Sequence, residues 1–257
     1  IFSLSRGYQP FLDSFMNIAI TGPAGVGKTK LAKCIGFVYG KSGILLRGDL
    51  IVLSPSDMIG QYIGHTAPKT VGNLLKGLEN VILIDEAYQI MPCQNGLIAD
   101  TKSFGPESIT EIVNFLDKYM GLSVMLIAGY KREIDGCFFA ANQGLPRRFP
   151  YRWELPTYSS FELFNIFLNE VSKRLNKQIF GKEIALYIYA LVSQLNEKDK
   201  QIFKNQAGDI INLVSNFLNF YFGEFTLKWE DGLDSQKEIV NYSFNEYLQV
   251  KNVYLRV

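Results

Sequence analysis

The sequence is poor in the residues that metal sites and nucleophilic catalysis most often use. His65 is its one histidine, so a Ser-His-Asp triad or a metal site with several histidine ligands is excluded or strained. The three cysteines, Cys34, Cys93 and Cys137, are an odd number at wide spacing, and none forms a C-x-x-C pair. This pattern is typical neither of a disulfide framework nor of a zinc site, and we expect three reduced thiols.

Charge of one sign and long apolar runs are also missing. Lys and Arg number 26 against 25 Asp and Glu, a net charge of +1 that excludes an overall basic, phosphate-coating surface but leaves room for a local basic patch. No uncharged apolar run approaches the ~18 residues that span a bilayer. The first residues, Ile1-Phe2-Ser3, show no signal pattern and no starting Met. We therefore expect a soluble, intracellular protein of which this chain is a fragment.

The hydrophobic pattern of residues 1–155 predicts a parallel sheet flanked by helices, because short apolar runs alternate there with helical periodicity. The expected strands are Asn17–Ile20, Leu50–Leu53, Val81–Ile84, Ser123–Ile127 and Tyr151–Leu155. The expected helices between them are Lys28–Tyr39, Pro68–Leu78 and Pro106–Tyr119.

The pattern changes at Pro156, after which no strand is expected. The expected helices there are Ser159–Leu175, Lys182–Leu195, Gly208–Phe222 and Ser243–Lys251. The sequence thus predicts two domains, an α/β domain over residues 1–155 and a small all-α domain over residues 156–257.

A glycine-rich segment joins the first expected strand to the first expected helix. It consists of Gly22, Pro23, Ala24, Gly25, Val26, Gly27, Lys28 and Thr29, which form the pattern G-x-x-x-x-G-K-T. Its glycines let backbone N–H groups point at an anion, and the helix directs its positive end to the same place. Lys28 supplies a charge for the β- and γ-phosphates, and Thr29 supplies a hydroxyl for Mg²⁺. The segment therefore predicts a nucleoside triphosphate site.

Two adjacent carboxylates follow the apolar run Val81–Ile84. Ligands bind at the carboxyl ends of strands in open α/β sheets, so Asp85 and Glu86 are expected to face the phosphates. We expect Asp85 to hold Mg²⁺ and Glu86 to polarise the attacking water.

Together with these two motifs, four segments carry a resemblance to a known family. They are Gly60–Thr70 (GQYIGHTAPKT), Ile84–Tyr88 (IDEAY), Ile127–Tyr130 (IAGY) and Asn142–Phe149 (NQGLPRRF). The chain resembles AAA+ ATPases, and more specifically the CbxX/CfxQ-like branch, which includes red-type Rubisco activases and sporulation-type AAA proteins. The resemblance implies a P-loop NTPase fold in which helices enclose a parallel sheet, followed by a helical lid, with Mg-ATP as the bound nucleotide.

The same resemblance implies a hydrolase that assembles into a hexameric ring and remodels a protein substrate. Arg148, or failing it Arg147, corresponds to the family's arginine finger, which reaches the nucleotide of a neighbouring subunit. Tyr62 corresponds to an aromatic pore loop that grips a polypeptide. A tyrosine packed into the core at a helix–loop junction is the alternative interpretation for Tyr62.

Two departures from the family pattern keep other functions open. Ala128-Gly129-Tyr130 stands where AAA+ proteins often carry a sensor asparagine, and Asn205–Asn212 lacks the arginine that their lid often carries. The missing arginine leaves open a scaffold that uses nucleotide only as an assembly switch. A nucleic-acid motor or loader is the other alternative, against which the near-neutral charge and the aromatic loop at Tyr62 argue.

Overall fold

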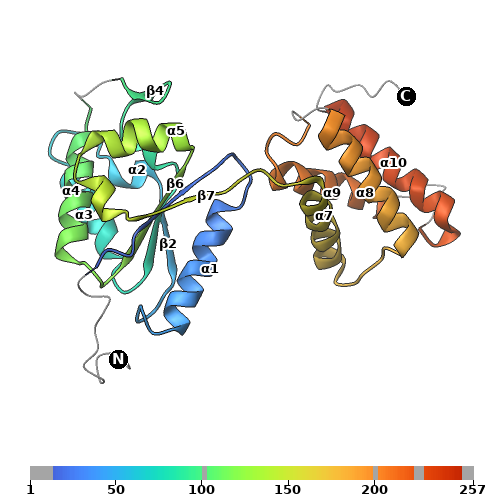
Figure 1. Cartoon of the computed structure of the whole chain (residues 1–257), viewed down its shortest axis with the longest axis horizontal. Coiled ribbons are helices and arrows are strands. Elements are labelled where there is room, and N and C mark those ends of the chain that lie inside the picture. The colour runs from blue at the N-terminus through green and yellow to red at the C-terminus, as the bar shows by residue number, and fades with distance from the viewer. Residues whose placement is uncertain (1–13, 100–102, 199–201, 223–228, 251–257) are drawn as a thin grey trace. The chain divides into compact units, whose positions relative to one another are not determined.

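The computed structural model describes residues 14–99, 103–198, 202–222 and 229–250 (Figure 1). Its contacts group the chain into two compact units. The first contains Ile1–Pro23 and Gly27–Leu155, and the second contains Ala24–Val26 and Pro156–Val257.

The first unit is built on a five-stranded, wholly parallel sheet. Its strands are β1 (Ile18–Thr21), β2 (Leu50–Leu53), β3 (Val81–Ile84), β6 (Val124–Gly129) and β7 (Tyr151–Glu154), in the order β2-β3-β6-β1-β7. Its long helices are α1 (Lys28–Lys41), α3 (Thr66–Leu75) and α4 (Gly105–Lys118). All five expected strands are present, and β1, β3 and β6 are buried along their whole length, as strands covered on both faces are. The edge strand β7 is exposed.

Alternate residues of each strand face opposite sides of the sheet and build two separate cores. On one side, Ile18 and Leu126 belong to the same buried cluster as Ile35 of α1. On the other side, Ile82 and Ile127 cluster with residues of α3 and α4. Figure 1 shows α1 on one side of the sheet and α3 and α4 on the other. The predicted sheet enclosed by helices is therefore confirmed.

Several short elements connect the strands and were not predicted. They are α2 (Pro55–Met58), η2 (Ala87–Ile90), β4 (Cys93–Gln94), β5 (Leu97–Ile98), α5 (Lys131–Glu133), η3 (Ile134–Phe138), η4 (Phe139–Ala141) and α6 (Leu145–Arg148). Of these, η3 is a turn of π-helix, a rare geometry that is frequent at functional sites. Elements this short have no hydrophobic period from which a sequence pattern is recognised.

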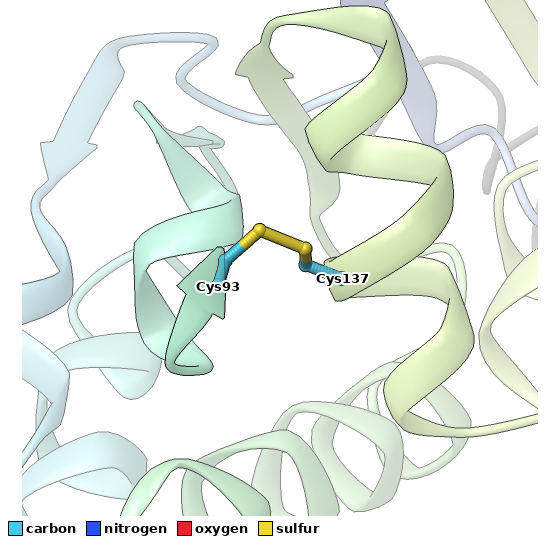
Figure 2. Close-up of a disulfide and its surroundings, with 2 residues drawn as sticks. All are labelled: Cys93 and Cys137. Carbon is cyan, nitrogen blue, oxygen red and sulfur yellow. A yellow bond between two sulfur atoms is a disulfide. The ribbon is translucent and has the colours of Figure 1, made fainter. Parts of the chain in front are cut away.

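A disulfide joins Cys93 of β4 to the buried Cys137 of η3 (Figure 2). Beside it the two segments touch so closely that a Cβ on Gly136 would lie 1.8 Å from the carbonyl oxygen of Gly96. Cys34 is a free, exposed thiol. The expectation of three reduced cysteines is therefore wrong for two of them, because the fold brings together residues 44 positions apart.

The second unit is helical in its described residues. Its elements are α7 (Ser160–Leu175), α8 (Lys182–Lys198), α9 (Ala207–Phe222), η5 (Trp229–Asp231) and α10 (Leu233–Val250). Phe167 of α7 and Phe217 of α9 meet at its centre, with ring centroids 5.7 Å apart. The last helix begins at Leu233 rather than at Ser243, and Lys251 lies outside the described residues. No described helix combines the length and the apolarity needed to cross a membrane.

Candidate active site

The glycine-rich segment forms a tight loop between β1 and α1. Gly27 precedes α1 with φ 92°, a left-handed conformation in which a side chain is strained. The Lys28 side chain then folds back over the loop, and its Nζ donates hydrogen bonds of 2.9 Å to the carbonyl oxygens of Gly22 and Pro23. The loop thus places an ammonium group at the positive end of a helix, an arrangement suited to phosphate.

Opposing effects act on the Lys28 ammonium. Burial lowers the pKa of Lys28, and the nearby carboxylates of Glu86 and Asp85 oppose that shift. Nζ also lies 5.4 Å from the ring centroid of Tyr130, within the range of a cation–π interaction. An anion bound at the loop would favour the charged lysine further, because its negative charge stabilises the ammonium group.

One hydrogen bond connects the loop to the acidic end of β3. The Thr29 hydroxyl donates to Oδ2 of Asp85 at 3.3 Å, and Oδ1 of Asp85 accepts the backbone N–H of Glu86 at 3.0 Å. In the described part of the chain, no group of three His, Cys, Asp or Glu side chains could hold a metal by itself. A hydroxyl with one carboxylate fits Mg²⁺, which keeps several waters and takes its other ligands from phosphates.

Glu86, two residues after β3 and directly before η2, has an unusual backbone conformation. Its φ of 50° places a non-glycine residue in the left-handed region, at a cost of roughly 1–2 kcal/mol. Its Oε2 is buried and accepts no hydrogen bond within the described residues. A strained carboxylate with a free, sheltered oxygen is suited to hold a water molecule.

Tyr88 lies beside Glu86, and the sequence patterns did not single it out for a role. Burial, together with a side-chain hydrogen bond to Glu86, raises the pKa of Tyr88 to about 12. The signal was present in the sequence, because Tyr88 closes the segment Ile84–Tyr88, but an aromatic residue there has no obvious chemistry by itself.

The two arginines of α6 have different surroundings. The Arg148 guanidinium is buried and pairs with both carboxylate oxygens of Asp117, and its Nη1 donates to the carbonyl oxygen of Gly144 at 2.7 Å. Hydrogen bonds from Arg148 and its positive charge lower the pKa of Asp117. Arg147 is exposed. Asp117 carries no sequence signal for this contact, because an acidic residue near the end of a helix is common on surfaces.

The loop around Tyr62 is open to solvent. Tyr62 is 67% exposed and Ile63 is 89% exposed, so the alternative of a packed core tyrosine does not hold. Gly60 donates its backbone N–H to the Thr66 hydroxyl at 3.0 Å, which fixes the base of the loop to the start of α3. The His65 ring lies edge-on to Tyr62, with centroids 5.6 Å apart. Two adjacent apolar side chains are thus displayed on a firmly attached loop.

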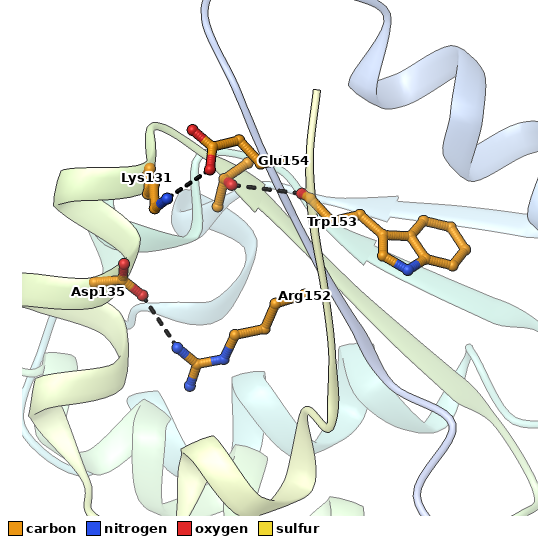
Figure 3. A network of polar contacts seen from close by, with 6 residues as sticks. Lys131, Asp135, Arg152, Trp153 and Glu154 are labelled. Atoms are coloured by element: carbon orange, nitrogen blue, oxygen red, sulfur yellow. Dashed lines mark hydrogen bonds and ion pairs between the residues drawn. The ribbon is translucent and has the colours of Figure 1, made fainter. Parts of the chain in front are cut away.

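Beyond β1, the edge strand β7 is attached to the segment that follows β6 (Figure 3). Lys131 of α5 pairs with Glu154, and Arg152 pairs with Asp135 of η3 at 3.3 Å. These pairs are about half exposed, so solvent screening keeps their contribution to stability small. The end of β6 lies next to β1 and the phosphate loop through direct strand pairing, in which Thr21 is opposite Gly129.

Comparison with known proteins identifies this unit. The ATPase family associated with various cellular activities (AAA) matches residues 18–139, which include the loop, Thr29, Asp85 and Glu86. The first unit is an AAA ATPase domain. The predicted resemblance to the AAA+ ATPases is therefore confirmed.

Relatives of the AAA domain include proteins of the CfxQ group. A putative cfxQ-like protein of Acanthamoeba polyphaga mimivirus is 29% identical over 92% of this chain and 60% of its own length. Stage V sporulation protein K of Bacillus subtilis is 35% identical over 62% and 47%, and protein CfxQ of Xanthobacter flavus is 34% identical over 59% and 46%. The chain therefore spans between 46% and 60% of the length of these relatives.

Solved structures support the fold of the whole chain. The FIGL-1 AAA domain in complex with ADP aligns with a TM-score of 0.55 at 15% identity, covering 94% of this chain and 73% of its own. A RuvB mutant of Thermotoga maritima aligns with a TM-score of 0.58 at 15% identity, covering 98% and 67%. At this identity the likeness concerns the fold alone, an α/β nucleotide-binding domain followed by helices.

Proposed function

We propose that this chain binds Mg-ATP and hydrolyses it at contacts between copies in a ring, expected from the family to be a hexamer. In this proposal the Tyr62 loop acts on a protein substrate and remodels it. The observation that supports hydrolysis most directly is the hydrogen bond between Thr29 and Asp85. It brings the two motifs of a phosphoryl-transfer site, 56 residues apart in sequence, to one place.

Each group of the AAA domain has a distinct task in this reaction. Lys28 and the backbone N–H groups of Gly22 and residues 24–29 hold the phosphates of ATP and offset the charge that develops on them. Thr29 and Asp85 would hold Mg²⁺, which supplies further neutralisation of the phosphate oxygens. Glu86 orients the attacking water and accepts its proton, for which its free Oε2 is available.

A neighbouring copy contributes an arginine from the pair Arg147 and Arg148. Arg148 occupies the position of the family's arginine finger, but it reaches a neighbour only after releasing Asp117. Arg147 is exposed and needs no such release. A guanidinium in either place matches the phosphoryl oxygens in a bidentate manner.

The Tyr62 loop favours a protein rather than a nucleic acid as the substrate. Tyr62 and Ile63 present an apolar, aromatic tip, which suits extended polypeptide, whereas a backbone of phosphates calls for a basic surface. The net charge of +1 points in the same direction.

The test is phosphate release from ATP by the full chain and by Glu86→Gln. We expect Glu86→Gln to lose at least about a hundredfold in turnover, because the base that orients water is gone. Glu111→Gln makes the same exchange on α4, where the carboxylate contacts the amide of Asn114, and serves as the control. Unchanged turnover in Glu86→Gln would mean that the assigned chemistry is wrong.

A further inference from the structure

The Glu86 carboxylate belongs to a residue with a left-handed backbone and has one oxygen, Oε2, without a hydrogen bond in the described part of the chain. The backbone at Glu86 is left-handed, with φ 50°, directly before η2. Oε2 accepts no hydrogen bond within the described residues. A base must be held at one place to orient a water, and a carboxylate with one free oxygen needs a partner on the other oxygen.

Tyr88 offers that partner from the next turn. The interaction of its side chain with the Glu86 carboxylate contributes to the raised pKa of Tyr88, and the side chain of Gln89 acts on the same tyrosine in the opposite direction. Burial and the contact with Glu86 raise the pKa of Tyr88 to about 12, so the hydroxyl keeps its proton at any working pH. A protonated phenol beside a carboxylate donates its hydrogen bond to that carboxylate.

The ring of Tyr88 is held by the end of β6. A Cβ on Gly129 would lie 2.9 Å from Cδ1 of Tyr88, so only glycine leaves room for the ring there. On its other flank Tyr88 packs against Tyr130, with ring centroids 6.0 Å apart. Tyr130 in turn lies 5.4 Å from Nζ of Lys28. Two aromatic rings therefore connect the catalytic carboxylate to the lysine of the phosphate loop.

We propose that Tyr88 is a positioning residue, whose hydroxyl orients the Glu86 carboxylate toward the attacking water while Gly129 and Tyr130 fix its ring. This inference rests on the proposed hydrolysis and adds to it a residue outside the two phosphate-site motifs. Since this role is exercised through Glu86, it affects the chemical step and not nucleotide binding.

The test is the exchange Tyr88→Phe in the full chain, which removes the hydroxyl and keeps the ring. We expect kcat for ATP hydrolysis to fall about tenfold or more, the usual effect of losing one hydrogen bond to a charged group. We expect the KM for Mg-ATP to stay within about twofold, because the lost contact matters only when water attacks. A purely structural role for Tyr88 does not produce this split between kcat and KM.

Two further variants make the result specific. Tyr151→Phe removes the hydroxyl of an exposed tyrosine on β7 and is expected to keep the wild-type kcat. Gly129→Ala places a methyl group against the Tyr88 ring and against Ile134 while keeping the hydroxyl, and is expected to lower kcat as Tyr88→Phe does. Because both changes act on one contact, the double variant is expected to be no slower than the slower single variant.

The outcomes separate this inference from the function on which it rests. A Tyr88→Phe protein with wild-type kcat, in a series where Glu86→Gln has lost turnover, overturns the positioning role alone. A raised KM at unchanged kcat overturns it as well. Retained turnover in Glu86→Gln overturns the proposed hydrolysis, whatever the Tyr88 variant does.

Discussion

Arg148 and Asp117, 31 residues apart in sequence, form a bidentate ion pair inside the AAA domain. The pair is asymmetric, because the Arg148 side chain is 5% exposed and the Asp117 side chain is 49% exposed. It ties α6 to α4. The carbonyl oxygen of Arg148 also accepts a hydrogen bond of 2.8 Å from the buried Asn17, which connects α6 to the start of β1.

The first prediction concerns stability and its dependence on pH. Arg148 holds the pKa of Asp117 below its usual range, so the carboxylate stabilises the fold above the unfolded pKa and loses this effect as the pH falls through the folded pKa. At pH 7 we expect Asp117→Asn to lower the free energy of unfolding by about 1–2 kcal/mol, a modest value because Asp117 is half exposed. Below about pH 4 the difference from wild type is expected to shrink.

Urea unfolding at pH 7 and at pH 3 measures this difference. Glu111→Gln, an acid-to-amide exchange on the same helix, is the control and is expected to stay within about 0.5 kcal/mol of wild type. A loss in Asp117→Asn that is equally large at both pH values would show that the charge of Asp117 is not its cause.

The second prediction separates the two arginines by mixing copies. We expect Arg148→Ala to lower the free energy of unfolding by about 3 kcal/mol, because it removes a buried side chain together with its hydrogen bonds to Asp117 and Gly144. We expect Arg147→Ala to change it by less than about 0.5 kcal/mol. If an arginine acts on a neighbour's nucleotide, mixing its alanine variant with Glu86→Gln restores part of the turnover that each has lost. Phosphate release from the mixture and from each variant alone checks this, and no restoration for either arginine would exclude action between copies.

The third prediction concerns the disulfide between Cys93 and Cys137. Closing a loop between residues 44 positions apart stabilises a protein by roughly 2–4 kcal/mol, so we expect Cys93→Ser to lower the free energy of unfolding by that amount under non-reducing conditions. Cys34→Ser, at an exposed free thiol, is the matched control and is expected to have no measurable effect. Alkylation without reductant, followed by mass measurement, is expected to label one cysteine per wild-type chain, and three labels would contradict the pairing.

The sequence predicts those parts of the fold that depend on neighbours along the chain. The apolar run Val81–Ile84 and the glycines before Lys28 predict a strand and a phosphate loop because local chemistry decides both. Contacts between distant residues have no such signal. Asn17 bridges Arg148 and the backbone of Met125, 131 and 108 residues away, and nothing in the expected strand Asn17–Ile20 indicates either contact.

The same reason explains which site residues the sequence did not indicate. Asp117 and Cys137 owe their roles to partners that only the folded chain brings close. The start of α10 at Leu233 was missed because its first turns are mostly polar, with Ile239 and Val240 as the first buried apolar residues after Leu233. In such a helix the buried stripe is completed by packing against α9 rather than by its own pattern.

The last prediction concerns the exposed loop at Tyr62. If Tyr62 binds extended polypeptide, Tyr62→Ala removes most of its apolar contact area and is expected to weaken binding of unfolded casein by about tenfold or more. Binding is measured by fluorescence anisotropy in the presence of ATP, with Glu86→Gln added to every variant to stop turnover. Leu97→Ala removes a similarly exposed apolar side chain, 69% accessible, from the β4–β5 hairpin and is the matched control. Equal affinities for casein in Tyr62→Ala and Leu97→Ala would show that general surface hydrophobicity, and not this loop, accounts for binding. Tight binding of single-stranded DNA that weakens steeply with salt would point instead to the nucleic-acid alternative, because release of counterions from phosphates produces that dependence.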